Sequence, residues 1–131
     1  MILPTELRTI ARARLTDAEA LLAAGRYDGS VYLCGYSVEI ALKARVCRTL
    51  KWHGFPSTNK DFEGYHNFRT HKLDVLLHLS GAEKKIKAEY LVEWSVVAKW
   101  EPDTRYKQIG TATASEAIDM ISSAKVLLKV L

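Results

Sequence analysis

The stretch GYSVEIALKARV, residues 35–46, decides the fold, because it carries apolar residues on almost every face of a helix. A helix of this kind is covered on several sides by other parts of a protein. Glu39 and Lys43 nevertheless lie in its middle, and buried charges are unfavourable unless they are paired. Glu39 precedes Lys43 by four residues, which is the favourable order for an ion pair on one helix. The stretch therefore predicts a central helix with a polar seam.

The charged pair belongs to a longer row of polar side chains. Placed at 100° steps, Tyr32 and Tyr36 fall on the same helical stripe as Glu39 and Lys43. Two interpretations of this row stay open. The side chains form a network that satisfies itself inside a core or a dimer seam, or they line a polar cleft in which Lys43 meets an anion.

Helical periodicity continues outward from this stretch through the whole chain. Gly25 ends the preceding helix, Pro102 ends a later one, and TASE at residues 113–116 is a capping box that starts the last helix. No internal repeat or alternating strand pattern occurs. The predicted helices cover residues 5–25, 28–53, 71–80, 83–99 and 113–130. We expect one all-α domain over residues 1–131, an up-and-down bundle of four long helices plus a short fifth, residues 71–80, across one end.

Composition excludes few classes of function. The 131 residues suit one domain, and a net charge of +4 is compatible with partners that carry phosphate without requiring them. No apolar run approaches the roughly 18 to 20 residues of a membrane span, so no membrane partner is expected. The first residues lack the features of a signal peptide, which makes the cytoplasm the expected location.

Three motifs together resemble the HEPN domain family. LLAAGRYDGSVYLCGYSVEIALKA, residues 21–44, resembles its second-helix core with the pattern E-x-x-L-K-A. THKLDVLL, residues 70–77, resembles its third helix with H-x-L-x-x-L, and TRYKQI, residues 104–109, resembles the R-Y element after its fourth helix. The motifs follow the family's order, and the resemblance covers nearly the whole chain.

The resemblance implies a helical bundle that commonly dimerises. Members of the family include metal-independent ribonuclease toxins, nucleotide-binding modules, and partners of small nucleotidyltransferases in two-gene toxin–antitoxin systems. Matched residue by residue, Glu39 and Lys43 correspond to the polar pair of the second helix, and His71 to the histidine of the third. Arg105 and Tyr106 correspond to the arginine–tyrosine element.

The pattern of the ribonuclease members is incomplete in this chain. Those members carry an arginine followed, after four to six residues, by a histidine late in the bundle, where the pair would stabilise phosphate charge and transfer protons. No histidine follows Arg105 here, and the spacing is met only by RTLKWH, Arg48 to His53, at the end of the second predicted helix. The catalytic candidates are therefore Arg48 or Arg105 with His53 or His71, and binding is favoured over cleavage.

Histidines elsewhere give weaker signals. His71, Asp74 and His78 share one face of the short helix, but a closed zinc site needs a fourth ligand and this face lies opposite a leucine stripe. We therefore predict no metal, and no motif for a cofactor is present. His66 and His71 flank Arg69 and are interpreted as loop polar groups and a cap, with a small phosphate-binding corner at the start of the short helix as the alternative.

Three hypotheses follow. The first is a HEPN-type binding module for a nucleotide or RNA, working with a protein partner such as a nucleotidyltransferase in a toxin–antitoxin system. The second is a metal-independent ribonuclease toxin, and the third is a structural protein without a ligand. A homodimer is expected because one small bundle should not cover the central helix on most of its faces. The predicted ligand-binding residues are Tyr32, Tyr36, Glu39, Lys43, His71, Arg105 and Tyr106.

Overall fold

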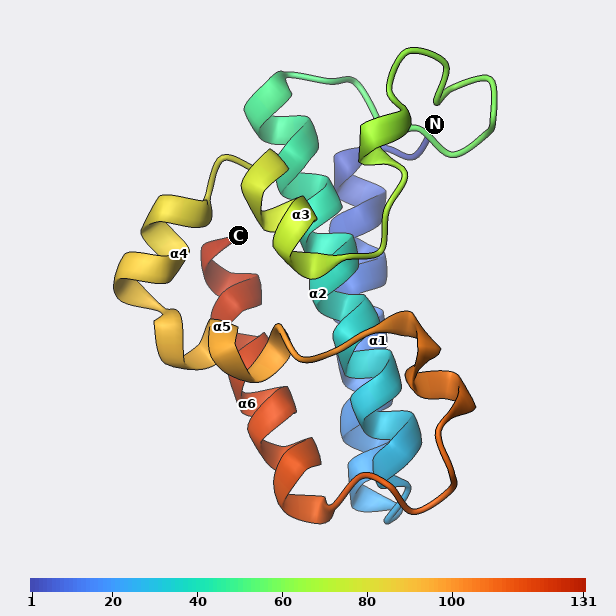
Figure 1. Ribbon diagram of the computed structural model, residues 1–131, viewed down its shortest axis with the longest axis vertical. Coiled ribbons are helices and arrows are strands. Elements are labelled where there is room, and N and C mark those ends of the chain that lie inside the picture. The colour runs from blue at the N-terminus through green and yellow to red at the C-terminus, as the bar shows by residue number, and fades with distance from the viewer.

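The computed structural model describes residues 1–131 and consists of helices joined by loops (Figure 1). The α-helices are, in chain order, α1 (Pro4–Ala23), α2 (Tyr27–Leu50), α3 (Leu73–Leu79), α4 (Glu83–Glu89), α5 (Leu91–Val97) and α6 (Ala114–Val130). Two short 3-10 helices are η1 (His66–Phe68) and η2 (Pro102–Tyr106). Pairing of the β type is limited to one isolated bridge between Ile2 and Phe55. The prediction of an all-α bundle is therefore confirmed.

The helices α1 and α2 form an antiparallel pair against which α6 and α3 pack. Gly25 has φ of 73°, a conformation that glycine adopts without strain, and it lets the chain reverse after α1. One apolar stripe of α1, which includes Leu7, Ala11 and Leu15, is buried against its neighbours. Ser30 of α2 donates its hydroxyl proton to the carbonyl of Ala18 at 2.8 Å, which ties the two helices together where both are buried.

The central helix α2 is covered within the single chain. It packs against α1, α3, α6 and η2, and its middle residues Val38 and Leu42 are fully buried. Small residues allow this close packing: the ring of Trp100 lies so near Gly35 that an added Cβ would come within 2.2 Å of it. A partner subunit is thus not needed to cover α2, which removes the physical reason from which a dimer was predicted.

The predicted long helix at residues 83–99 is wrong in one respect, because the chain forms two short helices there. Tyr90, with φ of −132° and ψ of 31°, separates α4 from α5. Ile86 of α4 and Trp94 of α5 are both buried in the main core, so the two short helices both pack on the bundle. The bundle thus has three long helices, α1, α2 and α6, and three short ones.

The remaining predicted boundaries agree with the structure to within three residues. The predicted cap of the last helix is confirmed in its first half: the Thr113 hydroxyl accepts from the backbone N–H of Glu116 at 3.1 Å and begins α6. The Glu116 carboxylate accepts from the Thr113 hydroxyl at 3.3 Å, and not from the Thr113 backbone N–H that a complete capping box uses. The connection from α5 to α6 contains η2 and crosses the first half of α2, as the orange segment in Figure 1 shows. No helix combines the length and the apolar character that a membrane crossing requires.

Candidate functional site

The buried carboxylate of Glu39 organises one end of the candidate site. Its side chain is 3% exposed, and each oxygen has its own partner. Lys43 Nζ lies 3.1 Å from Oε2, and His71 Nδ1 donates to Oε1 at 2.8 Å. Lys43 is 17% exposed and His71 is 59% exposed, so both partners reach the surface. Glu39 therefore acts as a buried anchor that holds two cationic or proton-bearing groups at the surface.

Aromatic rings continue this row toward the beginning of α2. The rings of Tyr32 and Tyr36 meet edge to face with centroids 5.2 Å apart. Tyr36 also lies edge to face with Trp100 at 4.9 Å and with His71 at 6.4 Å. Burial, followed by the neighbouring Tyr32 hydroxyl, raises the pKa of Tyr36 to about 12. The Tyr36 side chain thus stays uncharged, and its ring contacts both Tyr32 and His71, the histidine that is bonded to Glu39. We call Tyr32, Tyr36, Glu39 and Lys43 the polar row.

Arg105 of η2 lies beside the opposite end of the polar row. Its guanidinium is 4.7 Å from the centre of the Tyr106 ring. The hydroxyls of Tyr106 and then of Tyr32 raise the pKa of Arg105 above its ordinary value. Tyr32 and Lys43 are eleven residues apart on α2, which corresponds to about 16 Å along the helix. The predicted ligand-binding residues therefore follow α2, with Glu39 buried among partners that reach the surface, and Lys43 and Arg105 lie at opposite ends of the row and do not line one cleft together.

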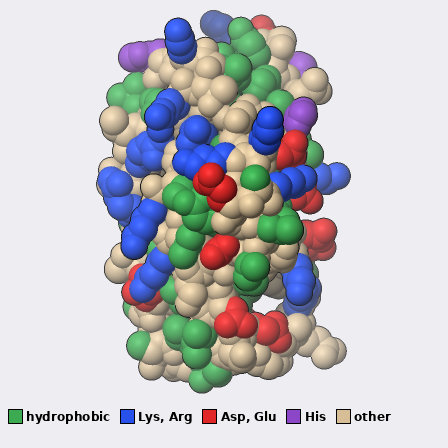
Figure 2. Space-filling view, turned by 90° about the vertical axis from the view of Figure 1, so that its left-hand side faces the viewer, with side chains coloured by type: hydrophobic (Ala, Val, Ile, Leu, Met, Phe, Trp, Pro, Cys, Tyr) green, Lys and Arg blue, Asp and Glu red, His purple; other side chains and the backbone are tan.

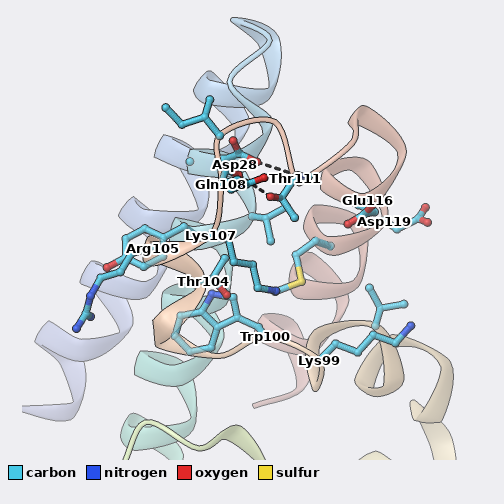
Figure 3. A pocket seen from close by; sticks show the side chains of 17 residues that line it. Asp28, Lys99, Trp100, Thr104, Arg105, Lys107, Gln108, Thr111, Glu116 and Asp119 are labelled. Atoms are coloured by element: carbon cyan, nitrogen blue, oxygen red, sulfur yellow. Dashed lines mark hydrogen bonds between the residues drawn. The ribbon is translucent and has the colours of Figure 1, made fainter.

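A cavity of about 530 Å³ adjoins the Arg105 end of the row (Figure 3). We call it the η2 cavity. It lies between the first turns of α2, the end of α5, the η2 connection and the first turns of α6. Tyr32 and Arg105, which the sequence singled out, belong to its lining. The other polar groups of the lining were missed by sequence reasoning, because they come from four separate segments and form no motif; they include Asp28, Lys99, Trp100 and Lys107.

Asp28 fixes the far wall of the η2 cavity. Its carboxylate accepts from the backbone N–H groups of Gly110 at 2.6 Å and Ala112 at 2.8 Å. Figure 3 shows Asp28 beside the connection that leads to α6. These two backbone bonds hold the pKa of Asp28 below its ordinary value. Asp28 thereby holds the connection between η2 and α6 against the start of α2.

The weaker catalytic candidates lie apart from the polar row. Arg48 is exposed on another face of α2, near Arg45. Burial, followed by charge repulsion from Arg48 and Arg8, lowers the pKa of the partly buried Arg45. His53 is exposed after the end of α2 and lines a separate cavity of about 250 Å³. Of the four candidates, only His71 and Arg105 contact residues of the row.

The other histidines and their neighbours have individual partners. Asp74 accepts from the indole Nε1 of Trp94 at 3.3 Å, and His78 lies 3.3 Å from Glu83. His71, Asp74 and His78 therefore face different groups, and no cluster of three histidine, cysteine or carboxylate side chains could hold a metal ion. Arg69 donates to the amide oxygen of Asn59 at 2.6 Å, so its guanidinium is engaged in a contact within the loop.

The geometry defines an all-helical bundle with a polar row on its central helix and cations at both ends of that row. The family model for the HEPN domain matches residues 5–60, which contain α1, α2 and the start of the following loop. Over these residues, which are fewer than half of the chain, the chain is similar to the HEPN domain family. No curated protein and no solved structure gives a significant match to the chain.

Proposed function

We propose that the chain binds the phosphates of RNA or of a nucleotide along the polar row of α2. The observation that supports this most is the order of chemical groups along the row. Arg105, the rings of Tyr32 and Tyr36, His71 and Lys43 follow one another, so that cations flank a run of aromatic rings. Proteins that bind single strands use this combination, because cations follow the backbone while rings stack on bases.

The charges of the row favour an anionic ligand. None of the ion pairs in the chain includes Arg105, whose exposed guanidinium is surrounded by phenol groups. Glu39 is the carboxylate in the row, and Lys43 and His71 already occupy both of its oxygens. A phosphate placed on the row would therefore meet uncompensated positive charge at Arg105 and proton donors along its length.

Replacing Arg105 tests this proposal. Loss of one charge-assisted contact to phosphate is worth about 1 to 3 kcal/mol, so Arg105→Ala should weaken binding of a short single-stranded RNA by about 5- to 150-fold. The melting temperature should hardly change, because Arg105 is exposed. Lys84→Ala is the matched control, since Lys84 is an exposed cation on α4 and away from the row.

Fluorescence anisotropy of a labelled RNA at two salt concentrations measures this effect. Affinity that falls with salt and with Arg105→Ala, but not with Lys84→Ala, supports the proposal. Equal affinity of wild type and Arg105→Ala, or no binding by wild type at low salt, contradicts it. A large fall in melting temperature on Arg105→Ala without any RNA binding would favour a structural role for the row.

The molecular context that we propose is a homodimer that works with a nucleotidyltransferase-type partner in a toxin–antitoxin pair. The family resemblance motivates the partner, and exposed apolar side chains motivate the dimer. Leu91 and Val92 of α5 are 54% and 76% exposed, and Ile118 of α6 is 50% exposed. Figure 2 shows apolar side chains among lysines and arginines on the face formed by α4, α5 and α6. Sedimentation equilibrium that gives only the 14.7 kDa monomer at high micromolar concentration would contradict the dimer.

A further inference from the structure

The indole nitrogen of Trp100 is an unsatisfied donor beside the η2 cavity. Trp100 is 5% exposed, and its Nε1 is the one buried side-chain nitrogen or oxygen in the chain without a hydrogen-bond partner. Leaving such a donor unpaired costs about 1 to 3 kcal/mol, so an unpaired group in a folded protein calls for a physical reason. Trp94, by comparison, donates its Nε1 proton to Asp74.

The surroundings of Trp100 show that its position is held in place. One part of its ring lies on Gly35, and its edge contact with Tyr36 has a centroid distance of 4.9 Å. The ring also belongs to the lining of the η2 cavity, and Figure 3 shows the indole nitrogen on the edge of the ring nearest Thr104 and the η2 segment. The unpaired donor therefore sits where a group that enters the cavity could accept its proton.

The cavity walls combine an apolar interior with charged groups of both signs: Lys99, Arg105 and Lys107 lie toward α5 and η2, and the exposed carboxylates of Glu116 and Asp119 lie on α6. Val31, Val96 and Met120 contribute apolar surface. Lys99 and Lys107 are exposed and form no ion pair, and Figure 3 shows Lys107 extending from the connection over the cavity. The carboxylate of Asp28 on the far wall is already occupied by two backbone N–H groups. A matching ligand is flat and mostly apolar. It has a neutral hydrogen-bond acceptor that reaches the Trp100 indole, and a negative group that lies near Lys99 and Lys107 at the opening of the cavity.

We propose that the η2 cavity takes up one nucleobase, with a ring nitrogen or carbonyl of the base accepting the Trp100 Nε1 proton and the attached phosphate held by Lys107. This proposal rests on the proposed function and deepens it, because Tyr32 of the polar row and Arg105 at its end both belong to the cavity lining. An aliphatic ligand would leave the indole donor unpaired. A ligand with a carboxylate at depth would place its charge away from the rim lysines.

Movement of the η2 segment accompanies uptake of the base. The indole nitrogen is closed off from solvent, so a lining group must shift before an acceptor reaches it. The segment from Arg105 to Gly110 is exposed at every position, which makes it the wall with the fewest packing contacts to lose. Asp28 holds the far end of this connection, so the shift takes place between η2 and Gly110.

The indole protons give a direct readout of this site. The chain contains three tryptophans, so a ¹H–¹⁵N spectrum of the full-length labelled protein has three indole signals. Titration with AMP, GMP, CMP and UMP should move the Trp100 signal downfield in a saturable manner with at least one nucleotide, as expected for a new hydrogen bond. Trp100→Phe assigns the signal. If that variant does not fold, Trp52→Phe and Trp94→Phe assign it by elimination.

Variants and a second ligand separate the parts of the proposal. Lys107→Ala should weaken nucleotide binding by about 5-fold or more while the matched control Lys84→Ala leaves it unchanged. Adenosine should bind more weakly than AMP. If the Trp100 signal does not shift with any of the four nucleotides at roughly 5 mM, the proposal is overturned. This concentration would largely fill even a site whose dissociation constant is about 1 mM. Equal binding of adenosine and AMP overturns the role of Lys107.

Failure of this inference can be told apart from failure of the proposed function. RNA binding that depends on Arg105, together with a Trp100 signal that RNA and nucleotides leave unmoved, contradicts the nucleobase cavity and leaves the proposed function standing. Absence of both RNA binding and nucleotide-induced shifts contradicts both.

Discussion

Replacing Lys43 by methionine tests how the buried Glu39 is maintained. The substitution preserves the length and much of the apolar packing of the side chain but removes the ammonium that lies 3.1 Å from Glu39 Oε2. Removing one partner of a buried ion pair costs about 3 to 5 kcal/mol, because the other charge is left without compensation. His71 still donates to Oε1, and Lys43 is itself 17% exposed. We therefore expect a smaller loss of about 2 to 3 kcal/mol in the free energy of unfolding.

This loss can be measured in two ways. For 131 residues, an unfolding entropy of about 2.1 cal/mol/K per residue converts the loss into a fall in Tm of about 9 °C. Urea denaturation should show a lower midpoint with an unchanged slope. His71→Ala is the matched comparison: its side chain is 59% exposed, so its contact with Glu39 is screened by water and its loss should cost about 1 kcal/mol or less.

A double-mutant cycle provides the result that would refute this reasoning. Glu39→Gln removes the stranded charge, so the double variant Glu39→Gln/Lys43→Met should regain at least about 1 kcal/mol relative to Lys43→Met alone. If the two single losses simply add, Glu39 does not depend on Lys43. If Lys43→Met is as stable as wild type, the description of Glu39 as a buried anchor is wrong.

Three further perturbations test the packing and the loop geometry. Gly35→Ala should lower stability by about 1 to 3 kcal/mol and shift tryptophan fluorescence, because its Cβ would lie 2.2 Å from the Trp100 ring; an unchanged melting curve would contradict the close approach. Asp28→Asn should speed amide exchange at Gly110 measured by NMR. Because the pKa of Asp28 is lowered from 3.8 on folding, the stabilisation of this connection by its carboxylate should hold above about pH 4 and fade as the pH falls below that value. Equal exchange rates at Gly110 at pH 3 and pH 6, after correction for intrinsic rates, would be inconsistent with this. Thr113→Ala should cost about 1 kcal/mol by removing the cap of α6, and urea unfolding tests whether it does.

The fold could be predicted largely from the sequence because its signals are local. Helical periodicity, Gly25 and the capping box at Thr113 each act within one or two turns, and the structure places helix ends near the predicted positions. The break at Tyr90 was not predictable in this way, because no proline or glycine marks it. The break therefore depends on contacts within the folded bundle, in which both α4 and α5 bury side chains.

The candidate site was predictable only where it follows one helix. Tyr32, Tyr36, Glu39 and Lys43 lie on one stripe by helical spacing alone, and the structure places them in that order. The pairing of His71 with Glu39 and the contact of Trp100 with Gly35 join segments far apart in the chain. No local pattern encodes such contacts, so the η2 cavity emerges only from the folded structure.

The α1–α6 side of the molecule offers the main rival surface for RNA. A second cavity of about 350 Å³ lies there, with four cations in its lining: Arg8, Arg12, Lys125 and Lys129. Lys125 pairs with Glu19 at 3.3 Å, and Arg8 donates to the carbonyl of Leu131 at 3.3 Å, so two of the four cations already have partners. The polar row, in contrast, adds aromatic rings to its cations.

Photo-crosslinking to a short single-stranded RNA that contains 4-thiouridine distinguishes these surfaces most directly. After digestion, mass spectrometry identifies the peptides that carry nucleotide. Binding along the polar row predicts crosslinks within residues 27–43 and 99–112, which include Tyr32, Tyr36 and Arg105, and predicts that Arg105→Ala reduces them. Crosslinks confined to peptides containing Arg8, Arg12 or Lys125, with residues 27–43 and 99–112 unmodified, would contradict the central claim.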